Sequence, residues 1–157
     1  MRLRTSVVRP LTVVAAALVS VSSLLAPAAN ADPSVQVPFK ADSGDSCRRG
    51  VTAGTLTWPG IVIRPTVVVD GYLADDYLTP CQSLDVYYSV ATFTAYSGKT
   101  VVDTESRKAD NERVTFRFEL ADSDGVDFID RVVVQVCRHT DLSPPDYCGT
   151  AQEYKHP

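Results

Sequence analysis

The sequence predicts an all-β protein, an antiparallel β-sandwich of six or seven strands with an immunoglobulin-like arrangement. Two observations lead to this prediction. Apolar and polar residues alternate along most of the chain after residue 50, in short runs that recur about every ten residues. No apolar period of about 3.6 residues, which is typical of a helix, persists beyond residue 31. A partly open barrel of the OB type is the alternative architecture for such a series of strands.

Residues 1–31 have the features of a secretory signal peptide that is removed on export. Three arginines and no acidic residue stand before position 10, and residues 11–25 are uncharged and mostly apolar. Ala29 and Ala31 then supply the pair of small residues that signal peptidase requires. Because the apolar run is shorter than the ~20 residues that span a bilayer, a membrane anchor is not favoured. We expect a secreted, extracellular protein that begins at Asp32.

The rest of the chain has the length of one domain. We expect an irregular lead-in over residues 32–50, rich in Asp, Ser, Gly and Pro, and a single sandwich domain over residues 51–157. The 157-residue chain has a net charge of −4, and the loss of three arginines with the signal peptide makes it −7. Such an acidic protein is not expected to bind nucleic acid or an anionic membrane surface.

Three strands are predicted up to residue 96, at residues 51–58, 61–72 and 84–96. The first ends at the turn signal WPG. The second carries apolar residues at odd-numbered positions, and Pro65 places it at a sheet edge or a bulge because proline has no N–H for the ladder. In the third, the apolar face runs from Leu84 to Val90 and then changes phase, so we expect a β-bulge near Ala91.

Four further strands are predicted in the second half, at residues 100–104, 113–120, 128–138 and 148–154. The strand at 113–120 alternates cleanly, with four apolar residues on one face: Val114, Phe116, Phe118 and Leu120. Residues 105–112 are predicted to be a charged connection. The sequence Ser123-Asp124-Gly125 favours a tight hairpin turn before the strand at 128–138.

Four cysteines follow the signal peptide: Cys47, Cys81, Cys137 and Cys148. An even number in an exported chain indicates two disulfides, and the spacing does not fit a zinc site. Four cysteines allow three pairings. The strand prediction favours Cys137–Cys148, because a hairpin brings these positions within the roughly 5.5 Å Cα separation that a disulfide needs. Cys47 and Cys81 then pair by elimination.

The stretch from Val67 to Cys148 contains VVVDGYL at 67–73, TPCQSLDVYY at 79–88, VVVQVCRH at 132–139 and PPDYCG at 144–149. In these segments the chain resembles small secreted actinobacterial β-sandwich proteins of unknown function, over about half of its length. The resemblance implies an exported sandwich whose final hairpin is linked by cysteines. It implies no activity.

His139 is followed by Asp141 and Ser143, which are the three residue types of a hydrolytic triad. Triad members normally come from separate elements that converge in space, so three residues within five positions are not expected to align. A histidine in a surface loop is the favoured interpretation. Carboxylates for glycoside hydrolysis are numerous, but no pair stands out. We therefore expect no catalytic residue and no enzymatic activity.

Four aspartates concentrate hard oxygen ligands in a short stretch: Asp122, Asp124, Asp127 and Asp130. Their spacing does not fit an EF-hand loop, because a frame with Gly125 at the sixth position puts Leu120 first and Arg131 last. An acidic turn is favoured, and a calcium site of another kind is the alternative. Asp75-Asp76 is a shorter pair of the same kind. We predict neither a metal site nor a cofactor.

Tyr87 and Trp58 are the candidates for a carbohydrate-binding surface, because sugars stack on flat aromatic rings. Tyr87 points opposite to Tyr88 in the predicted strand, and Trp58 precedes a Pro-Gly break. Packing at the rim of the core is the favoured role for these side chains.

The function that fits these features is a secreted, disulfide-stabilised binding or interaction module without catalytic activity. Its partner is expected to be a protein, a polysaccharide or the cell envelope, and the module itself a monomer. A small secreted hydrolase is one alternative. Another is a protease inhibitor, because a Cys137–Cys148 bridge would leave Leu142, Ser143 and two prolines in a short loop over 138–147, as in loops that present one side chain to a protease.

Overall fold

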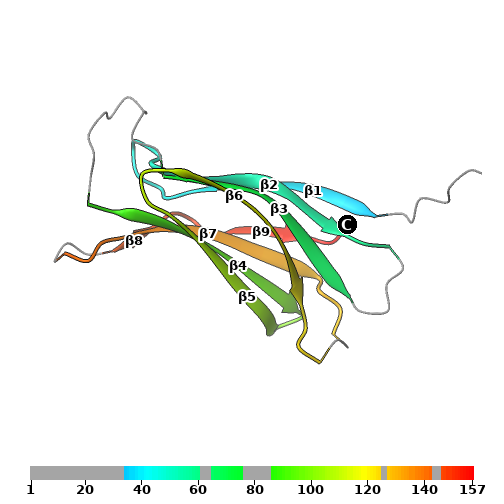
Figure 1. Ribbon diagram of the computed structural model, residues 1–157. Helices are drawn as coiled ribbons and strands as arrows, with labels where there is room; N and C mark the ends of the chain where they lie inside the picture. The colour runs from blue at the N-terminus through cyan, green and yellow to red at the C-terminus, as the bar shows by residue number, and fades with distance from the viewer. Residues whose placement is uncertain (1–33, 61–64, 76–85, 125–126, 143–145) are drawn as a thin grey trace, which may run out of the picture. The chain divides into compact units, whose positions relative to one another are not determined.

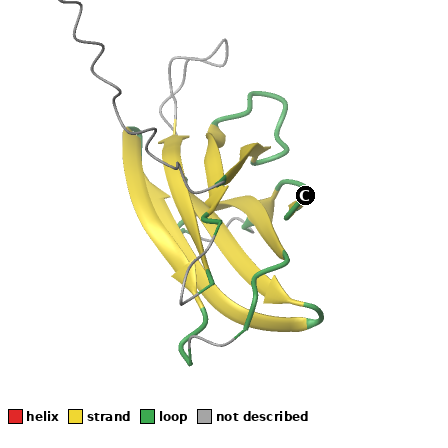
Figure 2. Ribbon diagram, turned by 90° about the vertical axis from the view of Figure 1, so that its right-hand side faces the viewer, coloured by secondary structure: helices red, strands yellow, loops and turns green. Residues whose placement is uncertain are grey.

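The structure is a computed structural model that describes residues 34–60, 65–75, 86–124, 127–142 and 146–157. It confirms the predicted class, because two antiparallel sheets pack face to face (Figure 1 and Figure 2). The described residues form nine strands where six or seven were predicted. In chain order these strands are β1 (Val35–Asp42), β2 (Gly50–Trp58), β3 (Thr66–Asp75), β4 (Tyr88–Ser97), β5 (Thr100–Ala109), β6 (Arg113–Ala121), β7 (Arg131–His139), β8 (Tyr147–Cys148) and β9 (Gln152–Lys155).

One sheet has the strand order β1-β2-β3-β6, and the other has the order β5-β4-β7 with β8 and β9 both pairing with β7. All of these pairings are antiparallel. Strands β5 and β6 follow each other in the chain but belong to different sheets, as do β6 and β7. The chain therefore crosses between the sheets twice in this region.

The core lies between the two sheets and is built from alternating residues, as the period of two predicts. Phe93 on β4 stands near its centre. Its ring lies 5.5 Å from that of Phe39 on β1, 5.4 Å from that of Phe116 and 5.3 Å from that of Phe118, the last two on β6. All three contacts are edge-to-face, which is a favourable geometry for aromatic pairs. Buried apolar side chains of this kind each contribute roughly 1.5–3 kcal/mol.

A close approach of two glycines makes room for one of these rings. Gly54 on β2 and Gly71 on β3 are direct partners in the ladder. A Cβ added at Gly54 would lie 2.8 Å from the Phe39 ring, and one added at Gly71 would lie 3.0 Å from it. The absence of side chains at both positions therefore seats Phe39 against the sheet.

The prediction of an irregular lead-in over residues 32–50 was wrong for its central part. Val35–Asp42 forms β1, which pairs with β2 over its whole length. Phe39 and Ala41 are buried, and Val35 and Val37 pack against the core, so this segment has the period-two pattern of a half-buried strand.

The charged connection predicted at 105–112 is also corrected, because β5 continues to Ala109. Three charged residues of this strand, Asp103, Glu105 and Arg107, occupy its inward-facing positions and remain partly exposed at the margin of the sandwich. Because apolar side chains are expected at such positions, these charges hide the apolar–polar alternation of β5 in the sequence.

Two further predictions need correction. The phase in β4 does not change at Ala91, because Ser89, Ala91, Phe93 and Ala95 all face inward. The register irregularity lies between Ala95 and Tyr96 instead. The segment around Ser123 and Asp124 does not join two paired strands, because it connects β6 in one sheet to β7 in the other.

Candidate functional site

Several turns and strand ends meet at one end of the sandwich, at the left of Figure 1. We call it the disulfide end. Its described parts are residues 43–49, Asp75, residues 86–89, residues 137–142 and residues 146–149. The loops at such an end are held by a rigid scaffold, and binding residues are often placed there.

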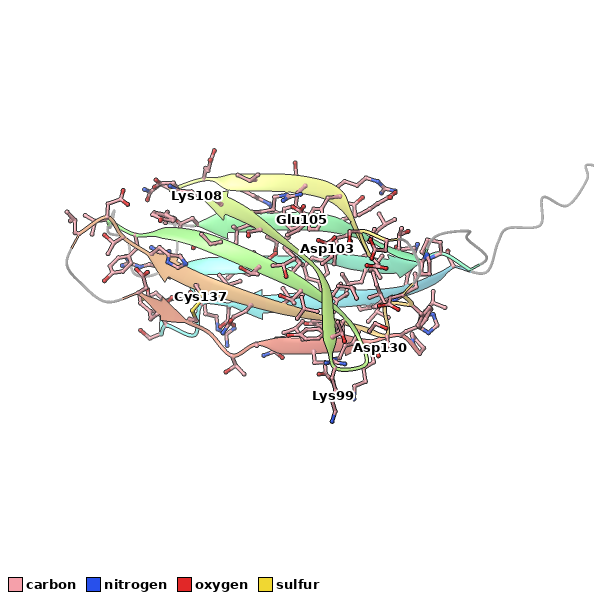
Figure 3. The ribbon with its side chains drawn as sticks, turned by 90° about the horizontal axis from the view of Figure 1, so that it is seen from below. Lys99, Asp103, Glu105, Lys108, Asp130 and Cys137 are labelled. Atoms are coloured by element: carbon pink, nitrogen blue, oxygen red, sulfur yellow. A yellow bond between two sulfur atoms is a disulfide. The ribbon has the colours of Figure 1, made fainter. Side chains whose placement is uncertain are left out.

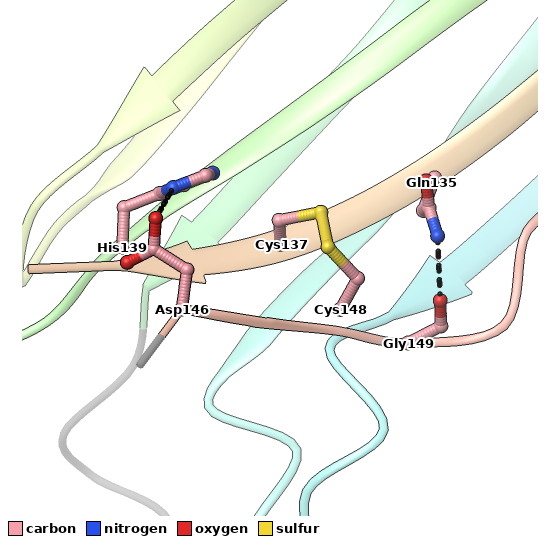
Figure 4. Close-up of a disulfide and its surroundings, with 6 residues drawn as sticks. All are labelled: Gln135, Cys137, His139, Asp146, Cys148 and Gly149. Atoms are coloured by element: carbon pink, nitrogen blue, oxygen red, sulfur yellow. Dashed lines mark hydrogen bonds and ion pairs between the residues drawn. A yellow bond between two sulfur atoms is a disulfide. The ribbon is translucent and has the colours of Figure 1, made fainter. Parts of the chain in front are cut away.

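A disulfide joins the last turn of this end to β7, and it confirms the predicted pairing of Cys137 with Cys148. The two residues face each other directly in the β7–β8 ladder, with their Cα atoms 4.0 Å apart (Figure 4). The next residue, Gly149, donates its amide to the carbonyl of Val136 at 2.9 Å and accepts a hydrogen bond from Gln135 Nε2 at 3.0 Å. The chain is therefore fixed covalently and by hydrogen bonds where it leaves the loop.

His139 and Asp146 close the base of the same loop. Nδ1 of His139 lies 2.8 Å from Oδ2 of Asp146 (Figure 4), and the other oxygen of Asp146 accepts the Thr140 amide at 3.3 Å. The hydrogen bond from His139 is the main reason why the pKa of Asp146 lies below its usual value; burial opposes this effect, and the Thr140 amide lowers the pKa further. The His139 ring is also stacked on the ring of Tyr88, with 5.7 Å between centroids.

These contacts show how His139 lies relative to Asp141 and Ser143, the residue types of a hydrolytic triad noted in the sequence. The carboxylate that hydrogen-bonds His139 belongs to Asp146, not Asp141. Ser143 lies outside the described residues. Within the described ranges, no serine or cysteine side chain forms a hydrogen bond with His139.

Beneath the loop lies a buried ion pair. The side chain of Arg138 is 1% exposed and that of Asp75 is 3% exposed, and Nη1 of Arg138 contacts Oδ1 of Asp75 directly. The same carboxylate oxygen accepts the hydroxyl of Ser89 at 3.0 Å, and Nη2 of Arg138 donates to the carbonyl of Tyr87 at 3.4 Å. The pair thus connects the ends of β3 and β7 with the start of β4, across both sheets.

Asp75 also holds the β5–β6 connection. Its second carboxylate oxygen accepts the amide of Asn111 at 3.1 Å, and its own amide donates to the carbonyl of Glu112 at 2.8 Å. Asn111 has a positive φ of 54°, a conformation that asparagine tolerates better than most residues. One buried carboxylate therefore fixes a turn as well as an arginine.

The turn before β2 is organised by Asp45. Its carboxylate accepts the Ser43 hydroxyl and the amides of Cys47 at 2.9 Å and Arg49 at 3.3 Å. Burial raises the pKa of Asp45, but these hydrogen bonds and the charge of Arg138 together hold it below 3.8. Cys47, in the same turn, is disulfide-bonded. Its predicted partner Cys81 lies outside the described residues, so that pairing stays a prediction.

Two large apolar side chains are exposed at the disulfide end. Val86 is 58% exposed and Leu142 is 60% exposed. Tyr87, next to Val86, is half-buried with its ring 5.6 Å from that of Tyr147. The opposite end also carries two such residues, Val101 and Phe128.

Neither aromatic residue predicted for sugar binding presents an open ring: Tyr87 is half-buried against the ring of Tyr147 at 5.6 Å, and Trp58 lies in the core. Trp58 is 2% exposed, and its indole N–H donates to the carbonyl of Ile129 at 3.0 Å, so it is a core residue. On the outer faces of the sheets, a cation covers each of three tyrosine rings. Lys108 lies 3.6 Å from the centroid of Tyr88, Arg131 lies 4.2 Å from that of Tyr96, and Arg113 lies 3.5 Å from that of Tyr72.

The aspartates of the predicted acidic turn have local roles. Asp130 accepts the amide of Gly98 and lies 3.2 Å from Arg131, which joins the β4–β5 turn to the start of β7. Asp122 accepts the amide of Asp127 at 3.2 Å. In the part of the chain that the structure describes, no three His, Cys, Asp or Glu side chains form a group that could hold a metal ion.

The cavities and grooves lined by described residues are either small or shallow. A cavity of about 100 Å³ lies at the opposite end, against Trp58, Pro65 and Phe128. A shallow polar groove of about 360 Å³ runs beside Lys40, Asp42 and Gln152. The first is smaller than the roughly 300–1,000 Å³ typical of small-molecule sites, and the second has few apolar groups.

Comparison with family models, with curated proteins and with solved structures found no match. Among the described residues, no helix has the length and hydrophobicity of a membrane span.

Sequence analysis identified the disulfide but missed the buried network of Asp75, Ser89 and Arg138. A signal for it was present. Arg138 follows Val132, Val134 and Val136 at the same spacing of two, so a charged residue stands in the buried phase of a strand. Such a residue requires a buried partner.

Proposed function

We propose that this protein is an exported binding module without catalytic activity, and that it recognises a protein partner through the disulfide end. The observation that carries the proposal is the exposure of Leu142 and Val86, 60% and 58%, above a base fixed by a disulfide and a buried ion pair. Exposed apolar side chains on a rigid support lose little entropy on binding and bury apolar area in the complex.

A protein partner is favoured over a polysaccharide because of the aromatic residues. Sugars bind on open faces of aromatic rings. Here Lys108 and Arg131 cover the rings of Tyr88 and Tyr96, and Trp58 is buried. The apolar residues at the disulfide end match the chemistry of a protein interface better, since such interfaces centre on apolar and aromatic contacts.

The experiment compares capture of proteins from the medium of the producing cells by three immobilised forms of residues 32–157. Wild type is compared with Val86→Asp/Leu142→Asp and with a matched control at the opposite end, Val101→Asp/Phe128→Asp. We expect a partner that wild type and the control capture equally and that the first variant captures about tenfold less. Equal capture by all three forms, or no specific capture, would contradict the proposal.

The absence of catalysis is tested separately. His139 and Asp146 form the one His–carboxylate pair in the described part of the chain. Turnover of ester, amide or glycoside substrates that is lost in His139→Ala would show a hydrolase instead.

Protease inhibition is a second candidate, which the exposure of Leu142 in a disulfide-closed loop favours. Residues 143–145 of that loop lie outside the described residues. Titration of chymotrypsin-like and subtilisin-like proteases decides this case. Inhibition by wild type and not by Leu142→Gly would support it, and rapid cleavage after Leu142 would exclude it.

Export is tested on the protein recovered from the medium. We expect Asp32 as its first residue, because Ala29 and Ala31 satisfy the cleavage pattern. Intact Met1 in the membrane fraction would contradict this part of the proposal.

A further inference from the structure

Edge strands expose backbone N–H and C=O groups, and proteins usually block them against other chains. Strand β1, at one edge of its sheet, is blocked. The hydroxyl of Tyr154 accepts the Lys40 amide at 2.9 Å and donates to the Lys40 carbonyl at 2.7 Å. Two residues earlier, Pro38 has no N–H to offer.

Strand β5, at an edge of the other sheet, is blocked by its own charged side chains. The carboxylate of Asp103 accepts the Thr104 amide at 2.7 Å, and Arg107 donates to the carbonyl of Ser106 at 2.6 Å. Asp103 and Glu105 lie along this strand beside the margin of the sandwich (Figure 3). Inward-pointing charges of this kind are a known means of preventing edge-to-edge pairing.

Strand β6 is the other edge of the four-stranded sheet, and described side chains block only its last residue in this way. Its last residue, Ala121, donates its amide to Asp103 at 2.9 Å, which turns this amide away from β3. The direction of backbone groups alternates along a strand. The backbone N–H and C=O groups of every second residue before Ala121 therefore point to the same free edge, namely those of Arg113, Thr115, Arg117 and Glu119. Among the described residues, no side chain forms a hydrogen bond with a backbone group between Arg113 and Glu119.

The free edge of β6, residues 113–119, has charges that match those of a second copy of the same edge. If two copies pair antiparallel about Phe116, Arg113 of one copy stands opposite Glu119 of the other, on both sides of the two-fold axis. Thr115 then stands opposite Arg117 in a hydrogen-bonded pair. Both charged side chains are exposed, and Glu119 has no ion-pair partner in the described part of the chain. On the inner side, Val114 and Phe118, both only partly buried, stand opposite each other.

We propose that residues 113–119 of β6 form a self-association edge, through which two copies join their four-stranded sheets into one continuous sheet. This dimer departs from the monomer that the sequence predicts. It is independent of the proposed partner site, because that site lies on the loops of the disulfide end and the pairing uses the side of the sandwich. Opposite charges facing each other across the two strands fix the register.

The first test is sedimentation velocity on residues 32–157 from about 10 μM to about 1 mM. We expect a monomer–dimer equilibrium within this range that weakens with added salt, because the charged pairs are exposed. In Thr115→Pro one edge N–H is lost at a position where edge strands tolerate proline, and we expect the dissociation constant to rise at least about tenfold. A chain that stays monomeric throughout would overturn the proposal.

The deciding test is an exchange of charges, which does not rely on proline being accepted. Arg113→Glu and Glu119→Arg should each weaken the dimer about tenfold, and the double variant should regain wild-type association. Residues 113 and 119 lie about 20 Å apart along one strand, so they cannot compensate each other within a single chain. Lys155→Glu, on the other sheet, is the matched control and should leave association unchanged. The proposal would be overturned if neither single change raised the dissociation constant of the dimer. It would also be overturned if the double variant dimerised no more tightly than the single variants.

Discussion

The guanidinium group of Arg138 and the carboxylate of Asp75 are in direct contact inside the sandwich, although the two residues lie 63 positions apart and in different sheets. Removing charges from water is costly, and the attraction between them offsets this cost only when their remaining polar atoms are also satisfied. Here Ser89, Tyr87 and Asn111 supply such contacts. The pair therefore fixes how the loops of the disulfide end meet.

Removing one member of this ion pair should strongly destabilise the fold. In Asp75→Ala the buried arginine loses its countercharge and Ser89 and Asn111 lose their acceptor, so we expect the free energy of unfolding to fall by about 3–5 kcal/mol. Urea denaturation measures the change. Asp70→Ala is the matched control, because its ion pair with Arg117 is 2.6 Å long but exposed, and should cost at most about 1 kcal/mol. Equal losses in the two variants would contradict the role given to burial.

A second prediction concerns acid. The pKa of Asp45 is lower in the folded protein than 3.8, in spite of burial, because Ser43 and the amides of Arg49 and Cys47 donate to the carboxylate. A lowered pKa stabilises the fold above the unfolded value, and this contribution is lost as the pH falls through the folded one. Wild type should therefore exceed Asp45→Ala in stability by a constant margin above about pH 5, and the margin should shrink below pH 3.8. Urea midpoints between pH 2 and 7 test this, and a margin that does not change with pH would contradict it.

The alternation of apolar residues was sufficient to predict the sandwich and the strands whose inner face is purely apolar, such as β6. It failed where an inner face contains charges. Asp103, Glu105 and Arg107 replace apolar residues in β5, so the second half of that strand was predicted as a connection. In β1 the residues alternate, but Pro38 and the flanking polar residues concealed the pattern.

The disulfide of the candidate site was predictable because its two cysteines flank a short loop. The buried network was not, because the choice of Asp75 as the partner of Arg138 depends on how strands from two sheets meet. The same limit applies to His139. The sequence indicated no partner for its ring, because the return of the chain to β7 is what brings Asp146 to it.

A third prediction concerns a close approach between two parts of the chain. Gly149 follows the disulfide and packs against β1, where a Cβ on this residue would lie 1.8 Å from the carbonyl oxygen of Asp42. Backbone atoms cannot give way as a flexible side chain can. Gly149→Ala should therefore lower stability by more than the roughly 1–3 kcal/mol typical of overpacking. Gly98→Ala is the control, because no atom lies within 4 Å of its added Cβ, and only the cost of its positive φ of 57° remains. A smaller effect at Gly149 than at Gly98 would contradict the packing seen here.

The Cys137–Cys148 bridge should stabilise the fold without being required for it. It closes a loop with a sequence separation of 11, for which the chain-entropy model gives about 3 kcal/mol. Strand β7 also pairs with β4 and β9, at positions that do not depend on the short β8 strand. Cys137→Ser/Cys148→Ser should therefore unfold at lower urea concentration but keep the β-sheet circular dichroism of wild type. Loss of all structure in this variant would contradict the prediction.

The pairing of all four cysteines can be read from one digest. Trypsin cleaves after Arg131, Arg138 and Lys155, so the unreduced protein should yield residues 132–138 linked to residues 139–155. The remaining bridge should link residues 41–48, which contain Cys47, to residues 50–99, which contain Cys81, because the Arg64–Pro65 bond resists the enzyme. Both products should separate into single peptides on reduction, as mass spectrometry would show. A link between residues 41–48 and 132–138 would contradict both pairings, since it would take Cys137 away from the residue that faces it in the β7–β8 ladder.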